Sequence, residues 1–315
     1  MHQFLQQFFT AFPQLASRDF YIAGESYGGS WVPALGARII ERQSTPPLQV
    51  EDEMTLSYSQ YINLRGVSIG NGLIRQSVQN PGGFEAFCTA ADSPLTRMQC
   101  EEWADRALEC ESALVVCEDD GFTTLACITA QQRCSQMSGV LIGSMERNPY
   151  DWRMQCDDPS YCYREIAAVQ AYMNIARVKV ALGATASMPF RDQSSDIYEK
   201  WEESGDLWMT SHQWVNYLLQ QRIRVLIYAG DKDINCHAPG MRRLVNRGLT
   251  WYGHPFFAPV PLSAWHAGGR LAGFGKAYGP LSYAEVADAG HLAPYDKPYE
   301  VLTLINAWIA GSLPN

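Results

Sequence analysis

The chain has 315 residues, of which 47% are hydrophobic, including 9 Trp, 16 Tyr and 12 Phe. This content suffices for a large packed core and excludes a disordered chain, and the length allows one large domain with a sizeable insertion. The formal net charge of -9 argues against nucleic acid or an anionic membrane as the main partner. No run approaches eighteen uninterrupted apolar residues, so we expect no transmembrane helix.

The first residues, MHQFLQQFFTAFPQL, predict an amphipathic helix from inside a fold. Five apolar side chains fall at helical spacing: Phe4, Leu5, Phe8, Phe9 and Phe12. A secretory signal needs a cationic start and a continuous apolar run, and this segment has neither. We therefore expect no signal peptide in the sequence as given.

Four apolar runs predict strands: DFYIA (19–23), LRGVSI (64–69), RIRVLIYA (222–229) and LSYAEVA (281–287). Helical patterns occupy residues 33–42 and 299–310. Apolar strands separated by helices indicate an α/β fold, with a mostly parallel sheet and helices on both faces. Between about residues 75 and 206 the sequence changes to cysteines and short polar helices. We expect residues 1–74 and 207–315 to form the core, with residues 75–206 as a cysteine-rich, mainly helical insertion.

Eight of the nine cysteines lie between Cys88 and Cys162, which predicts disulfides or a metal site. No C-x-x-C pair occurs, so we favour disulfides and expect no metal. Two pairs of cysteines are seven residues apart, which places each pair on one helix face. Two antiparallel helices could then carry two bonds, flanked by two local loops: Cys110–Cys134, Cys117–Cys127, Cys88–Cys100 and Cys156–Cys162. A different nesting is the alternative.

The segment Gly24–Gly28 has the pattern G-x-S-x-G between a predicted strand and a predicted helix. In that context Ser26 is a candidate nucleophile on a sharp turn, and the glycines are expected to allow close passage of the neighbouring chain. The helix N-terminus and the Tyr27 N–H would face a developing oxyanion. The pattern alone is short enough to arise by chance, so the flanking elements carry the interpretation.

A serine nucleophile needs a base and an orienting acid. His291 follows a predicted strand, whereas its rival His237 lies in the loop that holds the candidate acids. Asp231 and Asp233 both follow the strand at 222–229. Two other acids, Asp288 and Asp296, are too close in sequence to His291 to orient its ring from another loop. The resulting order, Ser–Asp–His, is that of an α/β-hydrolase.

Four segments, GESYGG, IGNGL, YAGDKDINC and AGHLAPYDKP, resemble consecutive signatures of the serine carboxypeptidases related to carboxypeptidase Y. Their order and spacing agree along the whole chain, and the cysteine-rich insertion falls where that family has one. The resemblance places the nucleophile at Ser26, the acid at Asp233 and the base at His291. The family's paired cysteines also agree with the predicted nesting.

The resemblance implies release of C-terminal residues from peptides or proteins through an acyl-enzyme, without a cofactor. Glu25 would bind the terminal carboxylate of the substrate and would have to be protonated, which favours acidic pH. Cys236 would be a partly buried thiol near the substrate, and Leu292 stands where methionine is common. The oxidised cysteines predict a secreted or a vacuolar, lysosome-like location.

The family also has an upstream segment with the first strands, a glycine-rich loop carrying a second oxyanion donor, and a partner carboxylate for Glu25. The sequence as given has no counterpart of this upstream segment, so it resembles an N-terminally truncated member of the family. Losing one oxyanion donor typically costs about 10²–10³ in rate. Two alternatives follow: an acyltransferase on the same scaffold, and an impaired relative that binds peptide. Oligomeric state is not predicted.

Overall fold

The computed structural model describes residues 1–44, 60–89, 95–122, 124–145, 147–156 and 162–313. The chain divides into two compact units, Met1–Ser93 with Thr210–Asn315, and Pro94–Met209. The first unit therefore combines the two ends of the sequence, and the second is inserted between them. Residues 75–89, which we expected in the insertion, belong instead to the first unit.

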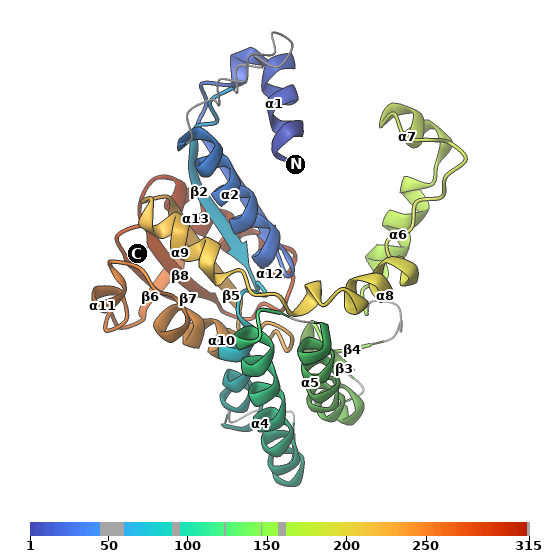
Figure 1. Ribbon diagram of the computed structural model, residues 1–315, viewed down its shortest axis with the longest axis vertical. Coiled ribbons are helices and arrows are strands. Elements are labelled where there is room, and N and C mark those ends of the chain that lie inside the picture. Colours follow the sequence, from blue (N-terminus) through green and yellow to red (C-terminus); the bar gives the residue numbers. More distant parts are fainter. Residues whose placement is uncertain (45–59, 90–94, 123, 146, 157–161, 314–315) are drawn as a thin grey trace. The chain divides into compact units, whose positions relative to one another are not determined.

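The first unit contains a six-stranded sheet in the order β1-β2-β5-β8-β7-β6 (Figure 1). Its strands are β1 (Phe20–Glu25), β2 (Leu64–Gly70), β5 (Arg224–Gly230), β6 (Ser263–Ala267), β7 (Arg270–Tyr278) and β8 (Leu281–Val286). Strands β1, β2, β5 and β8 are mutually parallel, whereas β7 and β6 continue the sheet in antiparallel pairing. The four parallel strands are those that the sequence predicted.

Within this sheet, the sequence did not predict β6 and β7, which form its antiparallel end. Strands β5 and β8 are buried almost throughout, so they stand out as apolar runs. Strands β6 and β7 contain both buried and exposed residues, and β7 contains two glycines and two cations. Such sequences lack the uninterrupted apolar pattern of a central strand.

Helices cover both faces of this sheet. Successive residues of β5 point to opposite sides, so Val225 and Ile227 join one apolar core while Leu226 joins another. The helical segments of the unit are α1 (His2–Ala11), η1 (Pro13–Leu15), α2 (Gly28–Ser44), α3 (Gln76–Gln79), η2 (Asn80–Gly82), η3 (Glu85–Thr89), α9 (His212–Gln220), α10 (Ala238–Arg243), η5 (Leu244–Gly248), α11 (His254–Phe257), α12 (Ala293–Asp296) and α13 (Pro298–Ile309). Residues of α2 and α9 contribute to the first core, and residues of α13 to the second.

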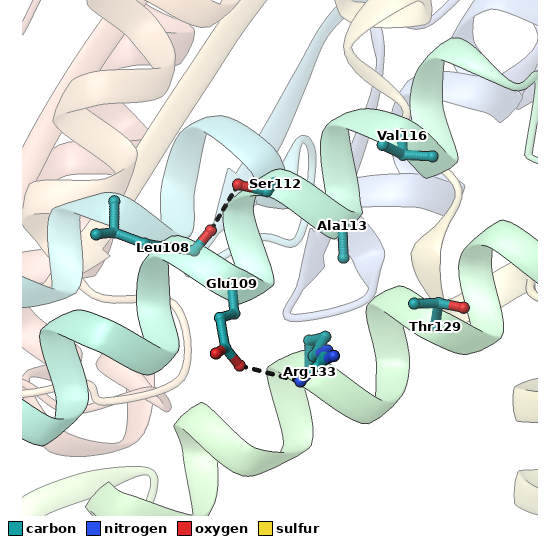
Figure 2. A pocket seen from close by; sticks show the side chains of 7 residues that line it. All are labelled: Leu108, Glu109, Ser112, Ala113, Val116, Thr129 and Arg133. Atoms are coloured by element: carbon teal, nitrogen blue, oxygen red, sulfur yellow. Dashed lines mark hydrogen bonds and ion pairs between the residues drawn. The ribbon is translucent and has the colours of Figure 1, made fainter.

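The second unit is mainly helical. Its elements are α4 (Arg97–Asp119), α5 (Thr124–Met145), β3 (Arg147–Asn148), β4 (Asp151–Gln155), α6 (Arg164–Met173), α7 (Ala176–Ala181), α8 (Ser195–Glu203) and η4 (Asp206–Trp208). Helix α4 begins with a capping box in which Thr96 and Gln99 satisfy each other's backbone N–H groups. An open groove between α4 and α5 carries the Glu109–Arg133 ion pair (Figure 2).

Three of the four predicted disulfides are present: Cys110–Cys134, Cys117–Cys127 and Cys156–Cys162. The first two join α4 to α5, as the seven-residue spacing predicted. Cys88 and Cys100 are both disulfide-bonded as well, in agreement with the fourth prediction. Disulfides of this kind fit an oxidising compartment.

Candidate active site

Ser26 occupies a sharp turn between β1 and α2. Its φ of +59° lies in the left-handed region, which is uncommon for a residue with a side chain. The Ser26 N–H donates to the Gly70 carbonyl at 3.0 Å, and the Ser26 carbonyl accepts from the N–H groups of Gly29 and Leu73 at 2.9 Å each. The turn is thus hydrogen-bonded to the end of β2 and to the loop that follows it. These hydrogen bonds maintain the strained conformation of Ser26.

Glycine is required at two positions around the turn, but not at both of those expected. A Cβ atom on Gly24 would lie 2.6 Å from the Val32 side chain, and one on Gly29 would lie 2.4 Å from the Leu73 carbonyl oxygen. A Cβ on Gly28 would meet only the Val32 side chain, at 3.9 Å. The close passage of the neighbouring chain therefore requires glycine at position 29. The expectation that it also requires glycine at position 28 was wrong.

Asp233 follows β5 and is 1% exposed. Its Oδ1 accepts the Asn235 N–H at 2.8 Å, and its Oδ2 accepts the Cys236 N–H at 3.1 Å. Oδ2 also accepts the side-chain amide of Asn71 at 2.8 Å. Donors on both oxygens fix the orientation of the carboxylate.

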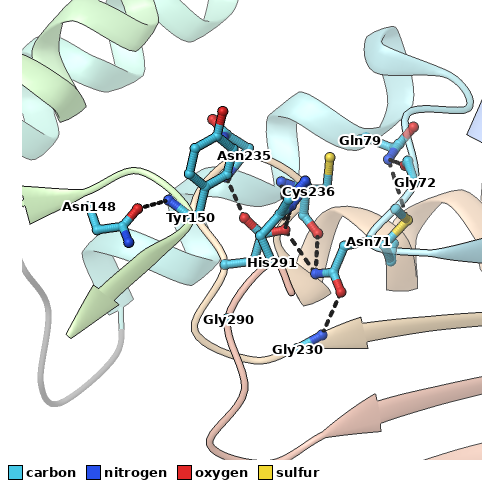
Figure 3. A network of polar contacts seen from close by, with 12 residues as sticks. Asn71, Gly72, Gln79, Asn148, Tyr150, Gly230, Asn235, Cys236, Gly290 and His291 are labelled. Atoms are coloured by element: carbon cyan, nitrogen blue, oxygen red, sulfur yellow. Dashed lines mark hydrogen bonds and ion pairs between the residues drawn. The ribbon is translucent and has the colours of Figure 1, made fainter. Parts of the chain in front are cut away.

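His291 lies in the loop between β8 and α12 and is 3% exposed. Its Nδ1 is 2.7 Å from Asp233 Oδ2 (Figure 3). Because a carboxylate accepts, Nδ1 carries the proton, and Nε2 of the neutral ring is left as the basic nitrogen. Burial lowers the pKa of His291, but the Asp233 carboxylate outweighs it and Glu25 adds to the effect, so the pKa is raised overall.

The other candidates for acid and base make different contacts. Asp231 forms an ion pair with Lys232 at 3.3 Å. Asp296 accepts the Gly290 N–H at 2.6 Å, so it contacts the backbone next to His291. His237 Nδ1 accepts the Gly240 N–H at the start of α10, and burial lowers the pKa of His237 to about 4. Of these acids, Asp233 is the one placed against the His291 ring.

Glu25 is the last residue of β1 and immediately precedes Ser26. Burial raises its pKa to about 7; His291 opposes this rise, while Asp233 and Asp296 add to it. Glu25 therefore interacts electrostatically with both members of the Asp233–His291 pair. A carboxyl group that titrates near neutrality can be a proton-bearing hydrogen-bond donor in weak acid.

The sequence also named Cys236, Tyr27 and Leu292 as residues of the site. Cys236 is buried, carries a thiol that forms no disulfide, and has a pKa raised by its burial. One polar atom from each of Asp233, Cys236 and His291 lies within 4.8 Å of the others. Tyr27 is buried immediately before α2, with its ring against Trp31, and Leu292 is the half-buried N-cap of α12.

The sequence interpretation missed Asn71 as a member of the site. The segment IGNGL (69–73) was identified as resembling a family signature, but Asn71 within it received no role. Asn71 is fully buried and donates to Asp233. An asparagine between two glycines at the carboxyl end of a parallel strand was the available signal.

Residues 1–311 match the model of a family described as serine carboxypeptidase. The chain is 34% identical to carboxypeptidase Y of Candida albicans, over 99% of this chain and 54% of that protein, so it spans about half of that relative's length. It is 32% identical to a serine carboxypeptidase-like protein of Oryza sativa subsp. japonica, over 100% of this chain and 69% of that one.

One solved structure has the same fold: a prohormone-processing carboxypeptidase, KEX1(Δ)P, from Saccharomyces cerevisiae. The TM-score is 0.79 at 18% sequence identity, over 98% of this chain and 65% of that chain. Together with the order of the strands, this likeness shows that the first unit has the α/β-hydrolase fold expected from the sequence.

Proposed function

This chain belongs to the serine carboxypeptidase family, and we propose that it releases C-terminal residues from peptides through an acyl-enzyme on Ser26. The observation that carries the proposal is the buried contact of 2.7 Å between His291 Nδ1 and Asp233 Oδ2. Both residues of this pair also interact electrostatically with Glu25, the residue immediately before Ser26.

In the proposed reaction the Ser26 hydroxyl attacks the scissile carbonyl carbon. His291 Nε2 takes the hydroxyl proton, while Asp233 stabilises the imidazolium that forms. The Tyr27 N–H, next to the start of α2, supports the negative charge on the carbonyl oxygen. His291 then protonates the leaving amine, and a water molecule, activated by the same ring, hydrolyses the acyl-enzyme.

Glu25 is proposed to recognise the terminal carboxylate of the substrate. Two ionised carboxylates would repel each other, so Glu25 must carry a proton when substrate binds. Its pKa of about 7 permits this at neutral and acidic pH. Recognition by Glu25 would make a carboxypeptidase favour acidic over alkaline pH on substrates with a free C-terminus. Cys236, three residues after the acid, and Leu292, immediately after the base, would contact the substrate.

The test is active-site labelling combined with a peptidase assay. We expect a fluorophosphonate to modify Ser26, located by mass spectrometry, and the Ser26→Ala variant to remain unlabelled. A peptide with a free C-terminus should lose residues stepwise from that end. Well-folded wild-type protein that neither labels nor cleaves would overturn the proposal. Transfer of the acyl group to an added alcohol in preference to water would identify an acyltransferase instead.

The substrates proposed are the C-termini of peptides or proteins, and the location proposed is secreted or vacuolar. A relative 31% identical to the chain, over 59% of its own length, is named vacuolar serine-type carboxypeptidase ATG42 of Saccharomyces cerevisiae. Within the described residues, the structure has no helix with both the length and the apolar content to cross a membrane.

A further inference from the structure

The turn after β2 places one amide side chain between the catalytic acid and the end of β5. Asn71 is 0% exposed, and its Nδ2 donates to Asp233 Oδ2 at 2.8 Å. Its Oδ1 accepts the N–H of Gly230 at 3.1 Å. Figure 3 shows this side chain with its dashed contact to Gly230 on one side and its contacts toward the acid loop on the other. One side chain therefore links the end of a strand to the carboxylate.

The chemistry of the two partners determines the orientation of the Asn71 amide. The Gly230 N–H can only donate, so it requires the amide oxygen, and the Asp233 carboxylate accepts, so it requires the amide nitrogen. Reversing the amide would break both hydrogen bonds and bring two oxygens together. Asparagine satisfies this pair of partners at full burial, where leaving a polar group unpaired is costly.

The backbone at position 71 further restricts the choice of residue. Its φ of +40° lies in the left-handed region, which asparagine, aspartate and glycine tolerate best. The Asn71 N–H donates to the Tyr228 carbonyl at 2.8 Å, which anchors the turn to β5. Because the turn also accepts the Ser26 N–H through Gly70, one loop contacts both the nucleophile's turn and the acid.

We infer that Asn71 is a positioning residue for the catalytic acid, and that it acts on His291 through Asp233. Oδ2 of Asp233 accepts three N–H groups, from Asn71, Cys236 and the His291 ring. The amide of Asn71 keeps Oδ2 directed at Nδ1 and offsets part of its negative charge. Removing this donor leaves the carboxylate both less constrained and more basic. The inference rests on the proposed function for its consequence in catalysis.

The first variant is Asn71→Gly, because glycine tolerates the φ at this position. A more basic Asp233 favours the imidazolium, so we expect the pKa of His291 to rise and Ser26 labelling to slow by about 10-fold or more below neutral pH. Within the described part of the chain, Asp233 and Glu25 raise the pKa of His291, Cys236 lies within 4.8 Å of its ring, and the variant leaves all three in place. The second variant, Asn71→Asp, keeps the acceptor for Gly230 but sets a carboxylate against Asp233, so it should label more slowly still at neutral pH.

A matched control is available at the other end of the same strand. Asn63 precedes β2 and also donates its side-chain amide to an aspartate, Asp19, at 2.8 Å, but on the surface. Asn63→Gly and Asn63→Asp make the same chemical changes far from the site. We expect both to label at the wild-type rate over the whole pH range.

The experiment measures Ser26 labelling against pH, and the pKa of His291 by histidine-selective NMR, in folded protein. The inference is overturned if both Asn71 variants fold and keep the wild-type labelling profile and His291 pKa. A lowered melting temperature with an unchanged profile would also overturn it, because that is a purely structural role. If wild-type protein does not label but the His291 pKa still shifts, the proposed function fails and the positioning role stands.

Discussion

Asp233 and His291 are 58 residues apart in the sequence, yet Oδ2 of the first lies 2.7 Å from Nδ1 of the second. The parallel pairing of β5 with β8 brings them together, because each residue lies in the loop that leaves the carboxyl end of its strand. The contact is buried, and the carboxylate raises the pKa of the ring against the effect of desolvation.

Peptides with a free C-terminus and peptides with an amidated C-terminus should have different pH profiles. Activity on both should rise as His291 loses its proton, because the base must be neutral. With the free carboxylate, kcat/KM should fall as the pH passes about 7, where Glu25 ionises and repels the substrate. The amidated peptide should lack this fall. Steady-state assays from pH 4 to 9 check it, and identical alkaline limbs would contradict the role of Glu25.

Glu25→Gln should stabilise the protein at alkaline pH. The folded state raises the pKa of Glu25 from 4.5 to about 7, so folding is penalised once the unfolded chain has released this proton and the folded chain has not. The penalty is absent below pH 4.5, grows as the pH rises, and is complete above 7. Allowing for solvent screening, we expect the variant to gain about 1–3 kcal/mol in free energy of unfolding at pH 8.

Denaturant unfolding at pH 8 and at pH 4 measures this difference for Glu25→Gln. The gain should be confined to pH 8. An equal gain at pH 4 would show that it comes from packing rather than from the buried charge.

Gly29→Ala and Gly28→Ala should differ sharply, although the two glycines are adjacent. The new Cβ at position 29 would lie 2.4 Å from the Leu73 carbonyl oxygen, whereas at position 28 its nearest contact is at 3.9 Å. We expect Gly29→Ala to cost about 3 kcal/mol and to abolish Ser26 labelling. Gly28→Ala should stay within about 1 kcal/mol of wild type. Melting temperatures and labelling measure both, and equal stability of the two variants would contradict the close approach.

Ser26→Gly should be at least as stable as Ser26→Ala. At most positions glycine is the less stable of the two by roughly 0.5–1 kcal/mol because of its backbone entropy. At a φ of +59° the strain on a residue with a Cβ reverses that order or cancels it. Both variants should remain unlabelled, so stability is compared without a difference in activity. Thermal unfolding that places Ser26→Gly about 1 kcal/mol below Ser26→Ala would contradict the strain.

Replacing Cys110 and Cys134 together by alanine should destabilise the second unit. Their disulfide closes a loop with a sequence separation of 24 and joins α4 to α5. The loss of this constraint on the unfolded chain predicts a cost of about 3 kcal/mol. Hydrogen exchange of α4 and α5 measures it. The Cys156→Ala/Cys162→Ala variant, with a separation of 6, is the control and should cost less; a larger cost there would contradict the prediction.

The residues of the candidate site were named from the sequence because each follows a recognisable strand. Buried parallel strands are apolar throughout, so β2, β5 and β8 stand out, and the groups after them become candidates. The half-exposed strands β6 and β7 gave no such signal. The nested disulfides followed from helical periodicity, which is local and therefore visible in the spacing of cysteines.

The sequence by itself determined the elements, the nucleophile's turn and a short choice of acids and bases, because these depend on patterns over a few residues. The tertiary structure decided which acid contacts His291, which glycine the turn requires, and that Asn71 belongs to the site. These outcomes depend on atoms from distant segments meeting within hydrogen-bonding or van der Waals distance. Likewise the pKa of Glu25 is raised by burial and by charges on other loops, which no local pattern encodes.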